Sequence, residues 1–416
     1  MKSAKLHRSG KGASSNKVCM LVLNEVITDG RVMRAATALA ENYDLVVLGW
    51  LRPERKDKLP KETIENLPFK LHLVELWTAK KLPKNAPGYA GRYLEALIRM
   101  LRIGVSTQPC VIHAHELSGL LIGYVLKKLT RGRLVYDAHE LYREQTIWQS
   151  KFIIRIIGWL ETYLMQACEE IIACNRQRAD IMYKEYGSPV LPKVIRNLPP
   201  FSQPTESDSS LRDFVKRQNS GINHIIVHPG GLVHRGEAVV LSALRKTPED
   251  VALVLLGHKN QNMSAEMEHL IREYNIGDRI FWHPPVPYDE LIGYLNSADL
   301  GLVLYPNTCR NNYYCASNKI YEFAMCGLPI VSVDFPPCKD ILEQYRYGVC
   351  FSWNDSDDLA RAITECLKDR SRYQQMRKEA LRAAGRENWD QEKLRLLEIY
   401  DQVRERSSPC LSATDG

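Results

Sequence analysis

The clearest structural signal in the sequence is the segment His228-Pro-Gly-Gly-Leu-Val-His-Arg-Gly236. It follows a short apolar run at 225–228, which predicts a buried strand, and it opens a helix. Adjacent glycines let a backbone pass close to a phosphate, and the free N–H groups at a helix start favour an anion. Arg235 can add a charge-assisted hydrogen bond to the same group. The segment is typical of an anion-binding strand–turn–helix unit, although a glycine-rich turn with a surface arginine accounts for it equally well.

The alternation of apolar runs and helices extends in both directions from this segment. The runs are short and continuous, as strands buried on both faces are, and the stretches between them have helical spacing. These features predict an α/β fold with parallel sheets covered by helices on both faces. We expect the strands at 18–24, 45–50, 70–76, 110–115, 134–139, 170–174 and 193–197, and then at 225–228, 251–257, 279–282, 300–305, 330–333 and 349–351.

The chain of 416 residues exceeds what one hydrophobic core organises, so we expect two domains. A proline-rich linker at 198–210 separates a first domain, 18–197, from a second, 211–388. A flexible basic tail, 1–17, precedes them, and a final amphipathic helix at 389–403 is expected to pack back on the first domain. Two such doubly wound domains would face each other across a cleft at the carboxyl ends of their strands, where ligands bind in these folds.

Positive charge is concentrated in the first half of the chain. The formal net charge is +7; residues 1–197 contribute +12 (31 Lys and Arg against 19 Asp and Glu) and the remainder −5 (25 against 30). A basic half indicates an anionic partner: nucleic acid, a membrane surface or a phosphorylated substrate. We expect no nucleic acid, because the basic half lacks a reader motif and interleaved aromatic residues. No apolar stretch reaches the ~18 residues that a membrane-spanning helix needs.

A second informative segment is Ala316-Ser-Asn-Lys-Ile-Tyr-Glu-Phe-Ala-Met-Cys-Gly-Leu-Pro-Ile-Val331. Ser317 or Asn318 is expected to cap a short helix, and Glu322 follows on its first turns. A carboxylate there can accept two hydrogen bonds from a vicinal diol, as the acidic residue of dinucleotide sites does for a ribose. The alternative is a solvated glutamate on a helix surface.

Two further blocks lie in the first half: Asp29-Gly-Arg31-Val-Met-Arg-Ala, and His113-Ala-His-Glu-Leu followed by Val135-Tyr-Asp-Ala-His139-Glu-Leu. Together with the two segments above, they resemble the GT-B glycosyltransferases, specifically the retaining family 4-like group (glycosyl transferases group 1) that uses nucleotide-sugar donors. The resemblance covers nearly the whole chain after residue 17. It implies a GT-B fold, two doubly wound Rossmann-like domains, and transfer of a sugar to a glycan or lipid-linked acceptor with retention, in polysaccharide or glycoconjugate synthesis.

The resemblance also implies roles for particular residues. Three are catalytic: His139 lies near the reacting sugar, Arg235 contacts the donor diphosphate and Glu322 holds the donor ribose. For His139 the alternative is a histidine satisfied by its neighbours at a strand end. The implied substrate-binding residues are Gly30, Arg31, Gly230, Gly231, Tyr314, Ser317, Asn318 and Lys319.

The sequence departs from the family pattern on the side of the donor sugar. The family often has two glutamates seven residues apart, and here the first position is Tyr314. The Gly-Arg pair common at the phosphate loop is Gly230-Gly231, and the spacing to Arg235 is short. The identity of the transferred sugar therefore does not follow from the resemblance.

No metal or other cofactor is expected. Positive charge and N–H groups can stabilise the departing diphosphate without one. The Asp355-Ser-Asp357 pair precedes a late helix, where capping explains it better than metal binding. His113 and His115 share one strand face, but no third ligand is evident near them in the sequence, so a structural role is favoured.

The acceptor is expected on the first domain. The helix after Lys80 and Lys81 and the helix at 151–159 combine basic and apolar residues, as helices lying on an anionic membrane do, although core helices with solvated arginines look the same. We therefore expect a cytoplasmic protein, with core helices as the favoured interpretation and peripheral contact with the inner face of the membrane as the alternative. Its eleven cysteines include no C-x-x-C pair, which fits a reducing compartment.

Two other functions share the sequence features. One is a nucleotide-sugar epimerase of the same architecture, and the other is a non-catalytic nucleotide-sugar binding protein, made conceivable by Tyr314.

Overall fold

The structure, a computed structural model, describes residues 16–51, 61–83, 85–145, 150–202, 211–232, 236–259 and 263–405. The chain divides into two compact units. Unit 1 takes its residues from 1–143, 150–195 and 393–416, and unit 2 from 144–149 and 196–392. Most of the predicted basic tail, up to residue 15, lies outside the described residues, as does the 203–210 part of the predicted linker. Unit 1 therefore draws on both ends of the chain.

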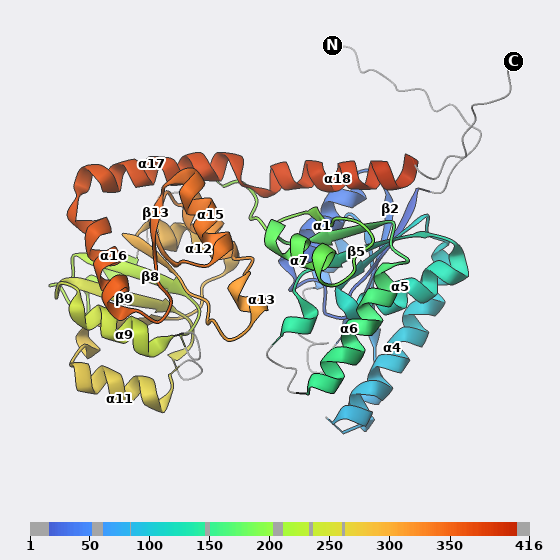
Figure 1. The fold of residues 1–416 in the computed structure, drawn as a ribbon, viewed down its shortest axis with the longest axis horizontal. Coiled ribbons are helices and arrows are strands. Elements are labelled where there is room, and N and C mark those ends of the chain that lie inside the picture. The colour runs from blue at the N-terminus through green and yellow to red at the C-terminus, as the bar shows by residue number, and fades with distance from the viewer. Residues whose placement is uncertain are drawn as a thin grey trace, which may run out of the picture. The chain divides into compact units, whose positions relative to one another are not determined.

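Unit 1 is built on a seven-stranded parallel sheet (Figure 1). Its strand order is β3-β2-β1-β4-β5-β6-β7, so the direction of winding reverses between β1 and β4. Ligands of doubly wound sheets bind at the carboxyl ends of the strands beside such a reversal. The strands are β1 (Lys17–Leu21), β2 (Asp44–Leu51), β3 (Lys70–Glu75), β4 (Val111–His115), β5 (Arg133–Ala138), β6 (Glu170–Ala173) and β7 (Lys193–Val194).

Helices flank this sheet because its central strands have no solvent-exposed face. All five residues of β4 are buried, as are the four after Lys17 in β1. Helices α4, α5 and α6 pack in succession, α4 against α5 and α5 against α6. The helical segments are α1 (Gly30–Ala40), α2 (Lys61–Glu65), α3 (Thr78–Lys81), α4 (Ala86–Thr107), α5 (Glu116–Thr130), the 3-10 turn η2 (Tyr142–Glu144), α6 (Lys151–Met165), α7 (Arg176–Lys184) and, from Lys393 onward, α18 (Trp389–Glu405).

Unit 2 repeats the arrangement with a six-stranded parallel sheet in the order β10-β9-β8-β11-β12-β13. The winding reverses between β8 and β11. Its strands are β8 (His224–Pro229), β9 (Val251–Leu256), β10 (Ile280–His283), β11 (Leu300–Val303), β12 (Ile330–Val333) and β13 (Gly348–Phe351). Its helical segments are α8 (Leu211–Lys216), α9 (Glu237–Lys246), α11 (Ala265–Tyr274), η3 (Gly277–Arg279), α12 (Tyr288–Asn296), α13 (Arg310–Tyr313), α14 (Asn318–Met325), α15 (Pro336–Tyr345), α16 (Ser356–Lys368) and α17 (Arg370–Arg386).

The α/β class and a strand at each predicted position are confirmed, but several strands end early. Strand β1 stops at Leu21 instead of Asn24, because the Asn24 side chain accepts a hydrogen bond from Val26 N at 2.8 Å and turns the chain. Asp355 caps α16 as predicted, accepting from the backbone N–H groups of Asp357 and Asp358. Within the part of the chain that the structure describes, every helix is too short or too polar to cross a membrane.

Candidate active site

The candidate site of unit 1 lies where β4 and β5 end. His113 and His115 close β4, Asp137 lies near the end of β5, and His139 follows that strand. The register pairs His115 with Asp137 across the two parallel strands. Because neighbouring parallel strands end at the same edge, these side chains meet although they are more than twenty residues apart in the sequence.

Arg31 holds the Asp137 carboxylate in a buried two-point contact. Its Nε lies 3.0 Å from Oδ2 and its Nη2 2.6 Å from Oδ1, while Nη1 donates to the carbonyl of Ile195 at 2.8 Å. Asp29 positions Arg31, since it caps α1 and accepts from the Arg31 and Val32 N–H groups. Burial alone would raise the pKa of Asp137, but Arg31, His139 and the contacts with His113 and His115 together outweigh burial and hold that pKa well below its usual range.

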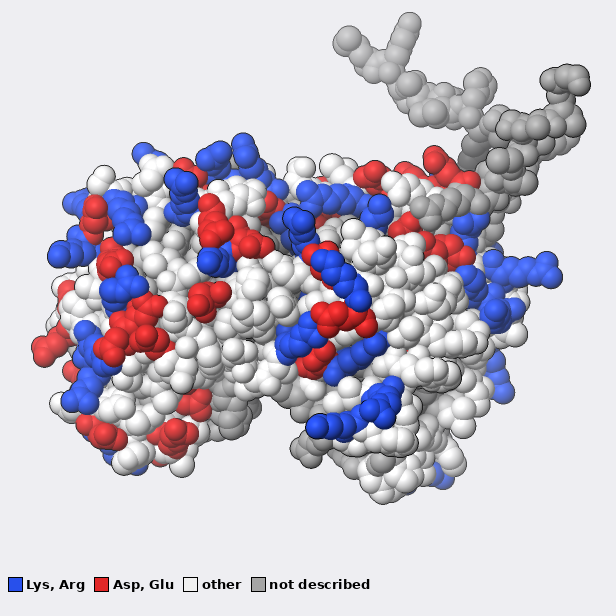
Figure 2. Space-filling view, in the orientation of Figure 1, with Lys and Arg blue, Asp and Glu red and all other residues white. Residues whose placement is uncertain are grey.

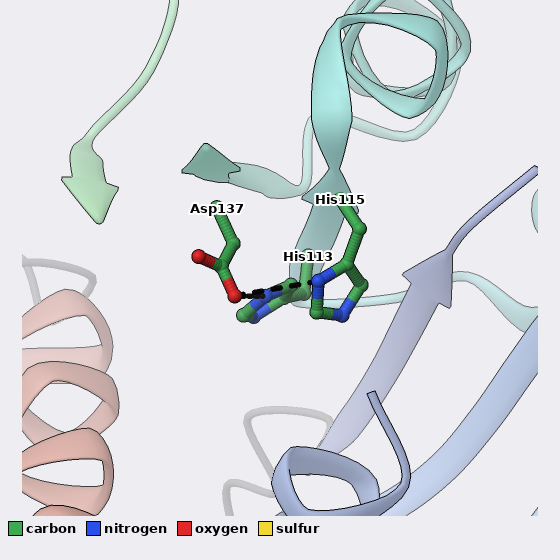
Figure 3. Close-up of side chains that lie close together, drawn as sticks. All are labelled: His113, His115 and Asp137. Atoms are coloured by element: carbon green, nitrogen blue, oxygen red, sulfur yellow. Dashed lines mark ion pairs between the residues drawn. The ribbon is translucent and has the colours of Figure 1, made fainter. Parts of the chain in front are cut away.

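Two histidines face the same carboxylate (Figure 3). His113 Nε2 lies 3.6 Å and His115 Nδ1 3.3 Å from Asp137 Oδ2. On its other side, His113 Nδ1 lies 2.6 Å from the hydroxyl of Tyr400, which donates to it when the ring proton sits on Nε2. Burial, followed by the proximity of His113, lowers the pKa of His115 to about 3, so this ring is neutral near pH 7.

His113, His115 and Asp137 also form a geometric candidate for a metal site. Their ligand atoms all lie within 4.8 Å of one another. This corrects the sequence interpretation that no third ligand lies near the two histidines: Asp137 reaches them from the neighbouring strand. The donor set fits a metal poorly, however, because both Asp137 oxygens already bind the Arg31 guanidinium, and a cation would have to compete with that cation. We interpret the cluster as a hydrogen-bonded ion-pair network.

His139 is the member of this cluster that retains access to solvent, with a side chain 16% exposed. Its Nε2 lies 2.9 Å from His115 Nδ1 and 3.6 Å from Asp137 Oδ2. Its Nδ1 lies 3.5 Å from Oε1 of Glu116. Burial opposes the charged imidazolium, but Asp137 and then Glu116 outweigh it and raise the pKa of His139. A protonated His139 can donate from Nε2 to the neutral His115.

Glu116 occupies an unusual backbone position at the junction of β4 and α5. Its φ of 60° lies in the left-handed region, which costs free energy in a residue with a side chain. Burial raises the pKa of its carboxyl group, and Oε2 is buried without a hydrogen-bond partner in the described residues. Strain and an unsatisfied buried oxygen cluster at functional sites. Glu116 therefore joins the candidate site.

The candidate site of unit 2 begins at the carboxyl end of β8, beside the reversal of that sheet. Gly230 has a φ of 99°, which favours glycine, and a Cβ built on it meets no atom of the described residues within 4 Å. As far as the described residues go, the space beside this backbone can admit a ligand. Gly231 follows, half-buried. Arg235, predicted to contact the donor diphosphate, lies outside the described residues.

Helix α14 supplies the second part of this site. Ser317 occupies its N-cap position, as expected, but its side chain accepts no capping hydrogen bond, and Oγ is buried without a partner in the described structure. The first N–H groups of the helix, from Asn318 and Lys319, are of the kind that binds anions. Glu322, one turn further on, is 7% exposed, so the alternative of a solvated surface glutamate is wrong.

The remaining predicted residues lie on both units. Tyr314 follows α13 and packs edge-on against Tyr313, with ring centroids 5.0 Å apart. Lys319 Nζ lies 5.9 Å from the ring centroid of Tyr305. In unit 1, Gly30 opens α1, and Arg31 is buried against Asp137, so its visible role is to hold that carboxylate.

Sequence reasoning missed Asp137, Glu116 and Tyr400 as members of the unit 1 cluster. The first two flank the predicted histidines and could have been found by pairing the ends of adjacent strands. Tyr400 lies 287 positions from His113, and no local pattern connects the two.

The two halves of the chain match two family models. Residues 31–198 match glycosyltransferase family 4, and residues 214–383 match glycosyl transferases group 1. The chain belongs to the GT-B glycosyltransferases, and it is an enzyme that transfers glycosyl groups.

Curated relatives are similar over much of the chain. D-inositol 3-phosphate glycosyltransferase of Xylanimonas cellulosilytica is 25% identical over 311 residues, which are 71% of this chain and 72% of the relative. Chitobiosyldiphosphodolichol beta-mannosyltransferase of Debaryomyces hansenii is 21% identical over 65% of this chain and 63% of its own length.

Solved structures confirm the GT-B fold. Sucrose-phosphate synthase of Thermosynechococcus elongatus has a TM-score of 0.74 at 14% identity, covering 94% of this chain and 99% of that one. Anabaena HepE, solved in complex with UDP and glucose, has a TM-score of 0.72 at 16% identity, covering 93% and 99%.

Proposed function

We propose that this glycosyltransferase takes its sugar from a nucleotide-diphosphate sugar bound on unit 2 and transfers it, with retention and without a metal ion, to an anionic glycan or lipid-linked acceptor bound on unit 1. The donor class is supported by HepE, whose structures contain UDP, glucose and UDP-glucose. In that scheme the nucleotide-sugar is a substrate, and no further cofactor takes part.

The observation that carries the donor assignment is the start of α14. A buried Ser317 hydroxyl, without a partner among the residues that the structure describes, lies at a helix N-terminus, and Glu322 is buried one turn on. A buried unsatisfied hydroxyl is costly in the free protein and gains its hydrogen bond when a phosphate or sugar oxygen arrives. Glu322 would then accept from the ribose hydroxyls, as the resemblance implies. Breaking the anomeric bond puts negative charge on the diphosphate, which preorganised N–H groups stabilise.

In the proposed reaction His139 interacts with the transferred sugar. Its raised pKa favours the imidazolium, which can donate a hydrogen bond to a sugar hydroxyl or to the departing oxygen. Arg31 and Asp137 support His139 from the protein interior. Arg31 keeps Asp137 ionised, and the negative charge of Asp137 favours the protonated form of His139. With retention, the acceptor hydroxyl attacks on the side of the leaving group, and the departing phosphate takes the acceptor proton.

An anionic acceptor fits the charge of unit 1 and the names of the relatives. One relative acts on an inositol phosphate and another on a lipid diphosphate, so both names contain an acceptor with phosphate. Residues 1–197 carry a surplus of twelve positive charges, whereas the donor site lies on the other unit. The surplus is therefore assigned to the acceptor.

A thermal-shift panel of nucleoside diphosphates and nucleotide-sugars tests the donor assignment. A ligand that binds only the folded state stabilises the protein and so raises its melting temperature. At a ligand concentration a hundredfold above Kd the stabilisation is about 2.7 kcal/mol. We expect a shift that Glu322→Gln reduces and that Glu379→Gln, at a half-buried position of α17 where Glu379 is paired with Arg382, leaves unchanged. If no member of the panel raises the melting temperature, the donor assignment is contradicted. The anomeric configuration of the product, and activity in a metal chelator, test retention and metal independence.

A nucleotide-sugar epimerase remains the alternative with a structural basis, since a putative UDP-N-acetylglucosamine 2-epimerase of Listeria monocytogenes shares the fold at a TM-score of 0.61 and 12% identity. Incubation of the enzyme with its nucleotide-sugar in the absence of any acceptor separates the two. An epimerised nucleotide-sugar supports the epimerase. Acceptor-dependent release of nucleoside diphosphate supports the transferase, and its loss in His139→Ala counts against a non-catalytic binding protein.

A further inference from the structure

The outer face of helix α6 in unit 1 carries a stripe of large apolar side chains. Phe152, Ile156, Trp159 and Tyr163 recur at helical spacing, and we call them the α6 stripe. Phe152 is 70% and Trp159 67% exposed. The opposite side of the helix faces the protein interior, and its buried residues are Gly158, Glu161, Leu164 and Met165. An exposed apolar stripe on a helix whose inner face is already packed marks an interaction surface.

The stripe is ordered by contacts among its own aromatic side chains and those of α5. The rings of Trp159 and Tyr163 stack, with centroids 5.8 Å apart. The hydroxyl of Tyr163 lies 3.1 Å from that of Tyr124 on α5, and Lys128 Nζ lies 5.4 Å from the Tyr124 ring centroid. Tryptophan and tyrosine combine an apolar ring with a polar group and are enriched where protein meets the boundary of a lipid bilayer.

The exposed charged side chains of α6 are both positive. Lys151 and Arg155 are exposed on α6, and Lys128 is exposed on α5. The one acidic residue of α6, Glu161, is buried and bonded to Arg143 and Tyr136. Figure 2 shows the surface in the region that α4 and α6 occupy in Figure 1 as largely white and blue, without red patches. An apolar stripe flanked by cations matches an anionic membrane surface.

The neighbouring basic helix, α4, is less suited to this role. Arg92 is buried and donates to the carbonyls of Leu82 and Pro83. Arg99 is paired with Glu95 at 2.7 Å. Part of the basic charge that the sequence places on α4 is thus used inside the protein, whereas Lys151 and Arg155 keep their side chains exposed.

We propose that the α6 stripe, with Lys151, Arg155 and Lys128, docks unit 1 on a membrane that contains anionic lipid. Phe152, Ile156 and Trp159 would enter the boundary between headgroups and acyl chains, and the lysines and arginine would contact lipid phosphates. The link to a lipid-linked acceptor rests on the proposed function, whereas docking itself does not.

Vesicle sedimentation with the full-length protein tests the docking. We expect binding to vesicles of equimolar phosphatidylcholine and phosphatidylglycerol, weak binding to phosphatidylcholine alone, and a decrease with salt. Replacing both Lys151 and Arg155 by Gln should weaken binding about 25-fold, since each charge near the surface contributes about fivefold. Phe152→Ser with Trp159→Ser should weaken it at least about tenfold.

The matched controls lie away from the stripe. Leu394→Ser removes a leucine of α18 that is similarly exposed, and Lys378→Gln removes an exposed charge on α17; both should bind as the unchanged protein does. Because all the substituted side chains are exposed, melting temperatures should stay the same.

Three results would overturn the proposal: no binding of the unchanged protein to anionic vesicles, equal binding by the stripe variants, or a dimer in solution that the stripe variants dissociate, which would make the stripe an interface between copies. The stripe variants should keep the thermal shift with nucleoside diphosphates. That measurement fails separately if the donor assignment is wrong, so the two failures are distinguishable.

Discussion

At the scale of single residues, the pKa values of neighbouring groups at the carboxyl edge of the unit 1 sheet are shifted in opposite directions. Arg31 keeps Asp137 ionised although the carboxyl is buried. The Asp137 charge in turn raises the pKa of His139, while His115, which is closer to Asp137 but fully buried beside His113, stays neutral. One charged and one neutral imidazole can therefore lie 2.9 Å apart and share a hydrogen bond. Pairs of groups whose pKa values are driven apart are typical of sites that handle protons.

Replacing Arg31 by Met should destabilise unit 1 strongly and in a pH-dependent way. The buried Asp137 carboxylate would lose its partner, at a cost of about 3–5 kcal/mol near neutral pH. The folded-state pKa of Asp137 lies below its unfolded value, so the ion pair stabilises at neutral pH and is lost as pH falls through the folded pKa. In Arg31→Met that pKa rises, so the deficit should shrink in acid, which urea unfolding at pH 7 and pH 5 measures.

The matched control for this prediction is Arg99→Met. Arg99 is paired with Glu95 in a contact where the arginine is 46% exposed, so its loss should cost less than about 1 kcal/mol. An Arg31→Met protein as stable as its parent, or a deficit that does not change with pH, would contradict the interpretation of Arg31 and Asp137 as a buried ion pair.

Replacing Glu116 by Gln should lower the pKa of His139. Glu116 Oε1 faces His139 Nδ1, and a neutral amide no longer favours the imidazolium. The pKa is measured by NMR titration of the His139 ring, whose signal is assigned by its absence in His139→Asn. If Glu116 is a positioning residue for His139, the pH profile of kcat/KM should move to lower pH by the same amount.

Glu140→Gln is the control for this titration, because Glu140 directly follows His139 in the chain but is not among the main groups that shift its pKa. It should leave the His139 titration nearly unchanged. An unchanged His139 pKa in Glu116→Gln, or equal shifts in the two variants, would remove Glu116 from the site.

At the scale of elements, two helices of unit 2 begin with serine in different ways. Ser264 caps α11 by accepting from Met267 N at 3.0 Å. Ser317 holds the same position on α14 without such a bond, and its hydroxyl is buried and unpaired in the described residues. A helix N-terminus left uncapped by its own serine retains its N–H groups for a ligand. The two serines therefore offer a direct comparison of a structural cap with a proposed binding cap.

Ser317→Ala should separate stability from binding. Removing an unsatisfied buried hydroxyl should leave the free protein as stable or stabilise it by up to about 1 kcal/mol, and it should weaken nucleoside diphosphate binding about five- to tenfold. Ser264→Ala should do the opposite, costing about 1 kcal/mol with no change in binding. Thermal melts and calorimetric titrations with UDP measure both quantities. Equal loss of stability in the two variants would mean that Ser317 is a structural cap.

Sequence reasoning reached the elements more completely than the site. Buried parallel strands such as β4 are continuous apolar runs, which a linear pattern records directly. The short helix α3 was not predicted, because its four residues are too few to form a periodic pattern. The role of Asp137 escaped for another reason: its contacts with Arg31 and His115 depend on the register of β4 and β5 and on the path of α1, which no local spacing encodes.

At the scale of the whole molecule, the end of the chain completes the core of unit 1. Residues from Lys393 of α18 belong to that unit, although unit 2 lies between them and the rest of it in the sequence. Tyr400 is fully buried, with its ring centroid 5.5 Å from that of Tyr43 and its hydroxyl on His113. Lys393 Nζ contacts Glu41 at 2.6 Å. The candidate site of unit 1 thus depends on a residue 287 positions away from His113 in the sequence.

Replacing Tyr400 by Ala should therefore destabilise unit 1 selectively. Deleting a buried aromatic ring costs about 3–5 kcal/mol, and here it also removes the partner of His113 Nδ1. Hydrogen exchange should quicken in β1, β4 and β5 and stay unchanged in β8, β9 and β11, and UDP should still protect unit 2.

Leu394→Ala, at an exposed position of the same helix, should change the stability of neither unit by more than about 0.5 kcal/mol. Tyr400→Phe keeps the ring and should cost only about 1 kcal/mol, for the lost hydrogen bond. If exchange quickens equally in the strands of both units, the two would unfold together, and the assignment of the C-terminal segment to unit 1 as a separate folding unit would be wrong.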